Sequence, residues 1–277
     1  MKFGFVTCVQ LGLSCIEKIY DIGGQLDVLF TLHDHKAKKK SGRIYLDEFS
    51  QKNNIPLIKI NHINDQDVIE VIRKYELDWL FIIGWSQIAS YDLINSPKKG
   101  CIGMHPTLLP IGRGRAAIPW AIIKGLEKTG VSMFVLDEGV DTGPILGQYE
   151  IPMKLNETAM ELYDKVNIAH ELLIAKIYPH LQNDQYDLTN QDHSLATVWE
   201  GRSPSDGELN LNMDINDVDK LVRATTKPYP GAYIVQNGVK RIIWQGRILA
   251  NKNGDENILA FKNGYYEVLS YDDLPLT

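Results

Sequence analysis

Short apolar segments recur at regular intervals along residues 1–150 of the chain. Most are continuously apolar rather than alternating, which is typical of strands buried on both faces of a parallel sheet. Helical patterns lie between them, one beginning at Asn64 and another covering Ala116–Leu126. This alternation predicts a doubly wound α/β domain with a mostly parallel sheet, in which ligands bind at the carboxyl ends of the strands. The seven expected strands are Lys2–Cys8, Leu26–Leu32, Ile55–Ile60, Trp79–Ile83, Cys101–His105, Val131–Leu136 and Ile145–Tyr149.

The pattern changes in the second half of the chain. Asn156 is expected to cap a long helix with one apolar face, formed by Leu162, Val166, Ala169, Leu173 and Ile177. Residues 182–194 are polar, and beyond them a short helix near 214–226 precedes β-rich sequence with hairpin turns at Gln236-Asn237-Gly238 and Lys262-Asn263-Gly264. We therefore expect a large α/β domain over residues 1–181, a linker over 182–194 and a small β-rich domain over 195–277.

Composition narrows the class of protein. The 277 residues carry a net charge of −6, which argues against broad electrostatic binding to nucleic acid. The three cysteines have no paired spacing, so neither a disulfide framework nor a zinc ribbon is predicted. No segment has the length of a membrane span or the pattern of a signal peptide, so we expect a cytoplasmic protein without a membrane partner. The first strand is not followed by G-x-G-x-x-G, which makes a nicotinamide dehydrogenase a poor interpretation.

The segment Gly100–Gly147 holds the residues with the clearest chemical meaning. His105 ends a buried strand and is followed by a proline, which cannot continue the sheet. Arg113 and Arg115 lie in a glycine-containing turn, and their guanidinium groups suit a carboxylate or a phosphate. The loop over residues 137–143 brings three carboxylates to the same edge of the sheet. Because a histidine beside a carboxylate is the usual arrangement for general acid–base catalysis, we expect an active site here rather than a structural histidine.

This segment resembles the signature of the 10-formyltetrahydrofolate-dependent formyltransferases. In that family an N-x-H-x-S/T-LLP strand end is followed by an R-G loop and an acidic D-x-G loop. His105–Pro110, Arg113-Gly114 and Asp141–Gly143 match these three parts, and Glu200–Glu208 and Arg223–Ala232 resemble the start of the family's small carboxyl-terminal domain. The resemblance implies a Rossmann-like catalytic domain over residues 1–181. It also implies transfer of a formyl group from 10-formyltetrahydrofolate to an amine, without a metal.

The resemblance further implies roles for single residues. Asp141 would orient and charge His105, which would serve as general base or proton shuttle. The family's asparagine, two residues before the histidine, is Gly103 in this chain. Loss of one such oxyanion donor can cost about a hundredfold or more in rate. Replacement donors in the sequence are Thr107, Ser86, Gln87 and protonated His105. We expect such a replacement, and the alternatives are a slow enzyme or a folate-binding relative with lost catalysis.

The same analogy places the pteridine of the donor between two loops, bound largely by backbone groups. Trp85 fits equally a contact with the pteridine or a place in the core. The expected donor-binding residues are Gly84, Trp85, Ser86, Gln87 and Ile88 in one loop and Leu136, Asp137, Glu138, Gly139 and Val140 in the other.

Charge guides the choice of acceptor. Residues 182–277 contain 9 Lys+Arg against 14 Asp+Glu, a balance of −5, whereas a domain that grips tRNA should be basic. We therefore expect an enzyme resembling the sugar-nucleotide N-formyltransferases, with methionyl-tRNA formylation as the alternative. The expected acceptor is a UDP-, dTDP- or GDP-linked amino-deoxy sugar for surface polysaccharide, such as lipopolysaccharide O-antigen, and the family analogy implies a homodimer. The expected substrate contacts are Pro110, Arg113, Arg115 and Tyr229, although Arg115 could instead brace the acidic loop.

Overall fold

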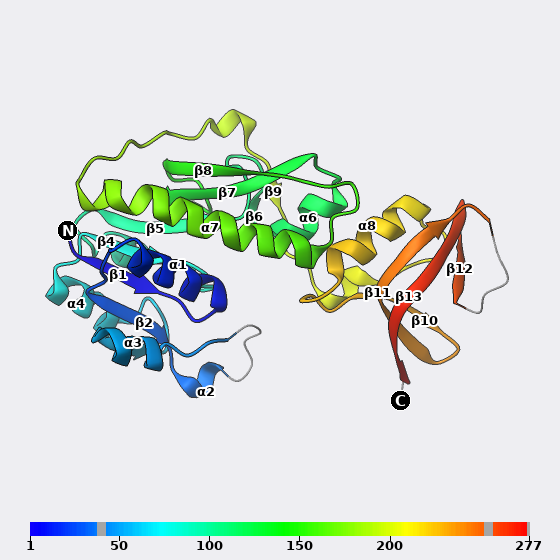
Figure 1. Ribbon diagram of the computed structural model, residues 1–277, viewed down its shortest axis with the longest axis horizontal. Coiled ribbons are helices and arrows are strands. Elements are labelled where there is room, and N and C mark those ends of the chain that lie inside the picture. Colours follow the sequence, from blue (N-terminus) through cyan, green and yellow to red (C-terminus); the bar gives the residue numbers. More distant parts are fainter. Residues whose placement is uncertain (38–42, 252–256, 276–277) are drawn as a thin grey trace. The chain divides into compact units, whose positions relative to one another are not determined.

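The computed structural model describes residues 1–37, 43–251 and 257–275. Seven strands are β1 (Phe3–Val6), β2 (Val28–Leu32), β3 (Leu57–Ile60), β4 (Trp79–Ile82), β5 (Gly100–His105), β7 (Lys128–Val135) and β8 (Ile145–Pro152). They form one sheet in the order β3-β2-β1-β4-β5-β7-β8 (Figure 1). Each of the seven expected segments overlaps one of these strands, although β5, β7 and β8 extend beyond the expected ends, and the predicted α/β fold with a mostly parallel sheet is confirmed.

Strand direction determines where the sheet presents its side chains. β1 pairs in parallel with β2 and β4, and β4 pairs in parallel with β5. β7 runs antiparallel to β5, so that His105 lies opposite Ser132. His105 is the last residue of β5 and therefore lies at the edge where the parallel strands end, the usual ligand side of an open α/β sheet.

Helices cover both faces of this sheet, which explains why the central strands β1 and β2 are buried along their whole length. On one face Phe3 and Phe81 contact Tyr178 of α7 (Ala159–Gln182). On the other face Val6 and Phe30 belong to the same buried cluster as the apolar side of α4 (Gln66–Tyr75). The other helices among the described residues are α1 (Gln10–Asp21), α2 (Asp34–Ala37), α3 (Asp47–Asn53), α5 (Tyr91–Ile94), α6 (Ala117–Ile123) and α8 (Ile215–Thr225).

Two expected helix caps are wrong. α7 begins at Ala159 because the side chains of Thr158 and Glu161 bond reciprocally to each other's backbone N–H, which leaves Asn156 outside the cap. α4 begins at Gln66, and the side chain of Asn64 bonds to a neighbouring loop instead.

A second sheet follows in the carboxyl-terminal part of the chain. Its strands are β10 (Ala232–Gln236), β11 (Val239–Leu249), β12 (Ile258–Phe261) and β13 (Gly264–Pro275), antiparallel in the order β10-β11-β13-β12. Asn237-Gly238 and Lys262-Asn263 form the two hairpin turns as predicted. α8 buries Val218 and Val222 against Ile243 of this sheet. The predicted β-rich carboxyl-terminal domain is confirmed.

The contacts between residues divide the chain into two compact units, and each unit is made of three separate stretches of the sequence. The first unit comprises Met1–Arg113, Gly130–Glu150 and Asn167–Thr197, and the second comprises Gly114–Thr129, Ile151–Val166 and Val198–Thr277. The segment expected to be a linker contacts the first unit, since Thr189 pairs with Ile145. Within the ranges described above, no helix combines the length and apolarity that crossing a membrane requires.

Candidate active site

The candidate site is centred on His105, which is buried at the end of β5. Its exposed fraction is 8%. The Nε2 atom lies 2.8 Å from the carbonyl oxygen of Gly112, and the Nδ1 atom lies 3.6 Å from Oδ2 of Asp141. Two acceptors thus face the two ring nitrogens. A neutral ring can donate to only one of them, whereas an imidazolium can donate to both. The structure therefore brings together the histidine and the carboxylate that the sequence paired.

Asp141 lies in a loop with an unusual backbone. Its φ angle is +56°, in the left-handed region that residues with a side chain rarely adopt. The loop is held by Asp137, whose carboxylate accepts hydrogen bonds from Gly139 N at 3.1 Å and from Thr142 Oγ1 at 2.6 Å. A side chain at Gly139 would collide with Thr142, so this turn requires glycine. The expected donor-binding residue Asp137 is thus engaged within its own loop.

Gln191 is the site residue that the sequence did not reveal. It lies within the segment predicted to be a polar linker, yet only 6% of it is exposed. Its Nε2 donates to the carbonyl oxygens of Asp141, at 3.0 Å, and Gly143, at 2.7 Å. Its Oε1 accepts from Nε and Nη2 of Arg113 at 3.2 and 2.7 Å. One carboxamide therefore joins the loop of Asp141 to the segment that follows His105.

Arg113 is placed differently from the free guanidinium expected for a substrate contact. It is 7% exposed, and besides Gln191 its Nη2 lies 3.1 Å from Nδ1 of His193. Its backbone N–H donates to Thr197. Pro110, another expected substrate contact, is half-buried, and its carbonyl oxygen accepts from Thr197 N. The part of the R-G loop up to Arg113 is thus fixed by the segment 191–197.

The space of the missing asparagine side chain is taken up by Leu136, the residue directly after β7. A Cβ atom built at Gly103 would lie 2.7 Å from Cδ2 of Leu136, an expected donor-binding residue. Leu136 is half-buried and packs on the core beneath α4. Among the candidate replacement donors, Thr107 is buried, and its hydroxyl has no hydrogen-bond partner among the described residues. Gln87 is turned away towards residues 61–63, where its amide donates to Asn61 and accepts from Ile63.

The other expected donor-binding loop, Gly84–Ile88, is tied to the segment 61–64 by two amides. Gln87 also accepts from the indole N–H of Trp85, which packs partly on the sheet core. Asn64 donates to the carbonyl oxygen of Ile88 and accepts from Ser90 N, both at 2.9 Å. Ser86 is exposed, and the apolar side chain of Ile88 is 79% exposed. Hydrogen bonds with residues 61–64 therefore hold the shape of this loop.

The remaining expected contacts lie in the second unit. Arg115 is exposed, and Tyr229 is half-buried, with burial raising the pKa of its hydroxyl. The Arg115 guanidinium lies beside Gly201, and Arg202 and Lys124 lie over the ring of Trp120 at 5.0 and 5.3 Å from its centroid. Within the described chain these three cations have no ion pair with a carboxylate. They form a cationic cluster, defined as Arg115, Lys124 and Arg202.

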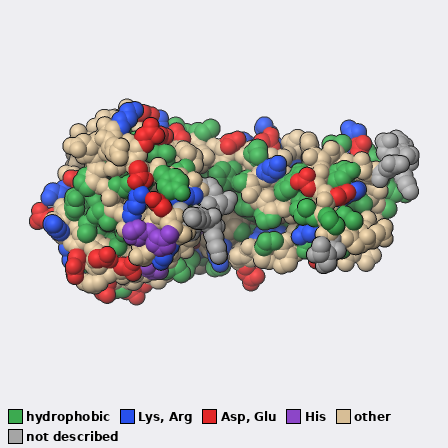
Figure 2. All heavy atoms as spheres, turned by 90° about the horizontal axis from the view of Figure 1, so that it is seen from below, with side chains coloured by type: hydrophobic (Ala, Val, Ile, Leu, Met, Phe, Trp, Pro, Cys, Tyr) green, Lys and Arg blue, Asp and Glu red, His purple; other side chains and the backbone are tan. Residues whose placement is uncertain are grey.

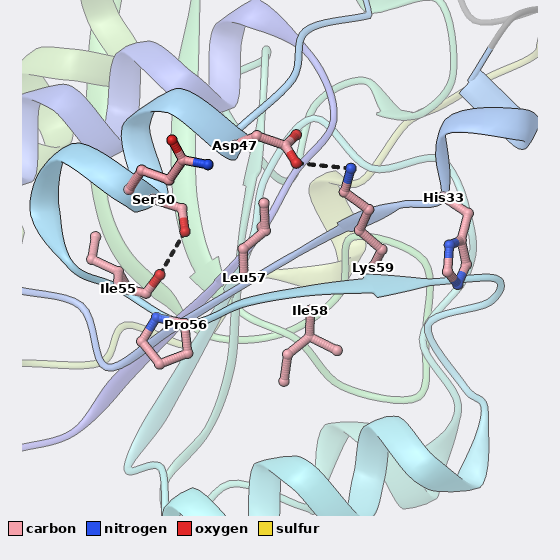
Figure 3. A pocket seen from close by; sticks show the side chains of 9 residues that line it. His33, Asp47, Ser50, Ile55, Pro56, Leu57, Ile58 and Lys59 are labelled. Atoms are coloured by element: carbon pink, nitrogen blue, oxygen red, sulfur yellow. Dashed lines mark hydrogen bonds and ion pairs between the residues drawn. The ribbon is translucent and has the colours of Figure 1, made fainter.

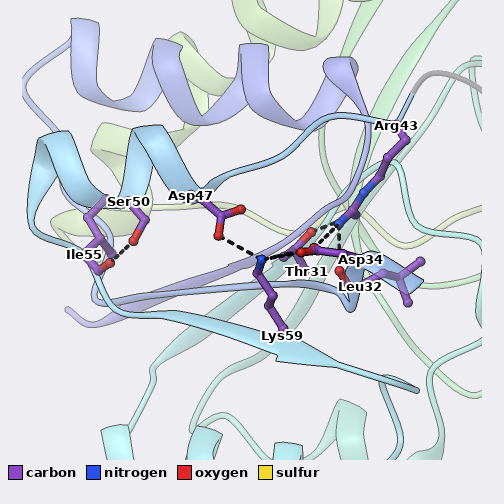
Figure 4. A network of polar contacts seen from close by, with 8 residues as sticks. All are labelled: Thr31, Leu32, Asp34, Arg43, Asp47, Ser50, Ile55 and Lys59. Atoms are coloured by element: carbon purple, nitrogen blue, oxygen red, sulfur yellow. Dashed lines mark hydrogen bonds and ion pairs between the residues drawn. The ribbon is translucent and has the colours of Figure 1, made fainter. Parts of the chain in front are cut away.

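A hollow of about 620 Å³ lies beside β3, lined by residues that include His33, Asp47 and Lys59 (Figure 3). The charged side chains that line it, Lys59 and Asp47, form ion pairs within the chain. Lys59 Nζ contacts Asp47 at 2.8 Å and Asp34 at 3.0 Å, and these hydrogen bonds raise the pKa of Lys59 (Figure 4). Arg43 donates to Thr31 and to a carbonyl oxygen of β2. In residues 1–37, 43–251 and 257–275 no three His, Cys, Asp or Glu side chains lie together in a way that could hold a metal ion.

Comparisons with known proteins were made on the whole chain. The formyl transferase family model matches residues 22–177, and the formyl transferase C-terminal domain model matches residues 202–272. A methionyl-tRNA formyltransferase from Clostridioides difficile (strain 630) is 32% identical over 257 residues, which cover 91% of this chain and 82% of that protein.

Two solved structures share the fold over most of their length. A sugar N-formyltransferase from Shewanella sp. FDAARGOS_354 is similar with a TM-score of 0.70 and 22% identity, covering 88% of this chain and 96% of that chain. An N-formyltransferase from Helicobacter canadensis, in complex with folinic acid and dTDP-3-aminofucose, is similar with a TM-score of 0.69 and 17% identity. That match covers 98% of this chain and 100% of that chain.

Proposed function

Because this chain belongs to the formyl transferase family, we propose that it transfers a formyl group from 10-formyltetrahydrofolate to the amine of a nucleotide-linked amino-deoxy sugar. The observation that carries the proposal is the pairing of His105 with Asp141 at the carboxyl end of β5. The pair gives the site a group that takes and returns a proton and a carboxylate that stabilises its charged form.

The reaction requires transfer of a proton between two nitrogens. The donor supplies an activated formyl carbon, to which an uncharged primary amine adds. The adding nitrogen becomes positively charged and loses a proton before the bond between the formyl carbon and the folate nitrogen breaks. His105 takes that proton and returns it to the departing nitrogen, so no net proton is consumed. The imidazolium that this step forms can donate to both flanking acceptors, and the contact with Gly112 opens when the ring meets substrate.

We place the donor on the loop Gly84–Ile88 and on residues 136–140. Ile88 and Val140 are apolar but 79% and 59% exposed, as expected of side chains that a planar ring would cover. The folinic acid bound to the Helicobacter canadensis relative supports a folate at this fold. The polar contacts would come from backbone groups of the two loops, since the side chains of Gln87 and Asp137 are engaged.

Two observations support a nucleotide sugar as the acceptor. The Helicobacter canadensis relative was solved with dTDP-3-aminofucose. The cationic cluster of Arg115, Lys124 and Arg202 supplies three positive charges, of which only Arg202 interacts with a nearby carboxylate of the described chain, Asp206, and a diphosphate would match them. We propose Arg115, rather than the buried Arg113, as the substrate contact of the R-G loop. A cytoplasmic homodimer acting in surface polysaccharide synthesis stays a prediction from the family resemblance.

Methionyl-tRNA formylation is the second candidate, favoured by the 32% identity to the Clostridioides difficile enzyme. The balance of −5 over residues 182–277 weighs against it, because tRNA binding depends on contacts between basic side chains and phosphates.

The test is a direct assay of transfer. Purified protein is incubated with 10-formyltetrahydrofolate and a panel of UDP-, dTDP- and GDP-linked amino sugars, and formylated product is detected by mass spectrometry. We expect product with one nucleotide sugar, a loss of about a hundredfold or more in His105→Gln, and a comparable loss in Asp141→Asn. Release of tetrahydrofolate without a formylated acceptor would contradict the proposal, as would binding of folate without turnover on any acceptor.

A further inference from the structure

We infer that Gln191 is a positioning residue that sets the spacing of the two groups flanking His105. This inference rests on the proposed formyl transfer. The two groups are the Asp141 carboxylate and the Gly112 carbonyl oxygen, which face opposite nitrogens of the ring. They belong to different loops, one before and one after β7. Gln191 contacts both.

The donor half of the carboxamide holds the loop of Asp141. Gln191 Nε2 bonds to the carbonyl oxygens of Asp141 and Gly143, one on each side of Thr142. Asp141 has a left-handed backbone conformation. This conformation costs free energy and persists only where the surrounding contacts enforce it. The two bonds enforce it and thereby fix the direction in which the Asp141 side chain leaves the loop.

The acceptor half holds the other side of the ring. Gln191 Oε1 takes two N–H groups of Arg113, the residue directly after Gly112. Gly112 N also donates to Thr197 Oγ1 at 2.9 Å, so the segment 191–197 fixes the carbonyl that faces His105. Because Gln191 is buried, water does not compete for these four bonds.

A carboxamide meets both requirements of this set of contacts. The set requires a donor towards two carbonyl oxygens and an acceptor towards a guanidinium, and a carboxylate or a methionine lacks one or both. Gln191→Glu keeps the acceptor for Arg113 and replaces the donor by a group that repels the carbonyls of Asp141 and Gly143. Gln191→Met removes both halves at similar size. Comparing the two variants therefore separates the effect of the donor half of the carboxamide from that of the acceptor half.

The experiment compares kcat and KM for formyl transfer in the wild type, Gln191→Glu, Gln191→Met and the surface control Gln66→Met. We expect both Gln191 variants to lower kcat by roughly 30-fold, with both KM values within about threefold of wild type, because a shift of the Asp141 carboxylate misaligns the acid–base pair. Gln66→Met, which removes an amide on the surface of α4, is expected to leave kcat unchanged. The melting temperature of Gln191→Glu is measured alongside, to check that this variant is folded.

A double-variant comparison tests whether Gln191 acts through Asp141. In an Asp141→Asn background, adding Gln191→Met is expected to lower kcat by less than about threefold further, because the partner it positions is already lost. A full additional 30-fold loss would overturn the inference, as would wild-type kcat in Gln191→Glu.

Hydrogen exchange supplies a readout independent of turnover. Peptides covering residues 137–143 are expected to exchange about tenfold faster in both Gln191 variants than in the wild type and in Gln66→Met. If the wild type transfers no formyl group to any acceptor, the proposed function fails, while exchange still decides whether Gln191 fixes this loop. Unchanged exchange at residues 137–143 would overturn the inference whatever the activity.

Discussion

Gly103 is the position at which this chain departs from the family pattern, and Leu136 shows how the departure is accommodated. A Cβ atom at Gly103 would lie within 2.7 Å of the Leu136 side chain. The contact is with the end of a flexible side chain, so the space can reopen if Leu136 moves or is shortened. Where the family has the polar side chain of asparagine, this chain therefore has glycine at 103 and the apolar side chain of Leu136 beside it.

This contact predicts coupling between the two positions. Gly103→Asn alone is expected to lower the free energy of unfolding by about 1–3 kcal/mol, because it overpacks the contact with Leu136. Combining it with Leu136→Ala should recover at least about 1 kcal/mol relative to the sum of the two single changes. Urea unfolding of the four proteins measures this term. Strict additivity would show that Leu136 does not occupy the space of the missing side chain.

His105 could be predicted from the sequence because it ends a recognisable strand, and parallel strands present their ends at the ligand edge of the sheet. Asp141 could be predicted from the family resemblance, although the strand before it, β7, runs antiparallel to β5, so strand direction alone does not bring the two residues together. Gln191 could not be predicted, because it lies in a polar segment with no periodic pattern, 50 residues after the loop it holds. Its burial depends on two carbonyls and a guanidinium that only the folded chain brings together. Because these partners are distant in sequence, the polarity of residues 182–194 indicated solvent exposure. In the fold Gln191 is nevertheless buried among its hydrogen-bond partners.

At the scale of elements, the loops at the end of the sheet are supported by amide side chains from neighbouring segments. Asn64 illustrates this, because its sequence position before α4 predicted a helix cap. In the fold the cap position is Asp65, and Asn64 instead holds the main chain of Ile88 and Ser90. Asparagine suits either role, since its side chain both donates and accepts. Sequence alone could not decide between a local and a distant partner.

The role of Asn64 gives a test of where the folate donor binds. Asn64→Ala is expected to raise KM for 10-formyltetrahydrofolate by about tenfold with kcat within threefold, because it releases the loop Gly84–Ile88 without touching His105. Initial-rate kinetics measure both constants. Asn53→Ala removes a comparable bond between an amide and the backbone in α3 and should change neither constant. An unchanged KM in Asn64→Ala would argue against this loop as the donor site.

At the scale of the whole molecule, the distribution of charge separates the two acceptor classes. Acidic and basic side chains are interspersed on the face seen in Figure 2, and the described residues there form no continuous basic area. The three cations of the cationic cluster lie in the second unit, and two of them, Arg115 and Lys124, lie outside the acidic range 182–277. Such an arrangement suits a ligand with two phosphates better than one with many, because each phosphate contact requires a positive side chain.

The charge distribution therefore predicts poor use of tRNA. At physiological salt, kcat/KM for initiator methionyl-tRNA is expected to lie at least about a hundredfold below that for the preferred nucleotide sugar. The logarithm of tRNA affinity should fall with the logarithm of salt concentration with a slope of magnitude below about 3, since few phosphates can be neutralised. Filter binding over a salt series measures the slope, with a methionyl-tRNA formyltransferase as the positive control. A slope as steep as that of the control, together with efficient formylation of the tRNA, would make tRNA the acceptor and leave the cationic cluster as part of its binding surface.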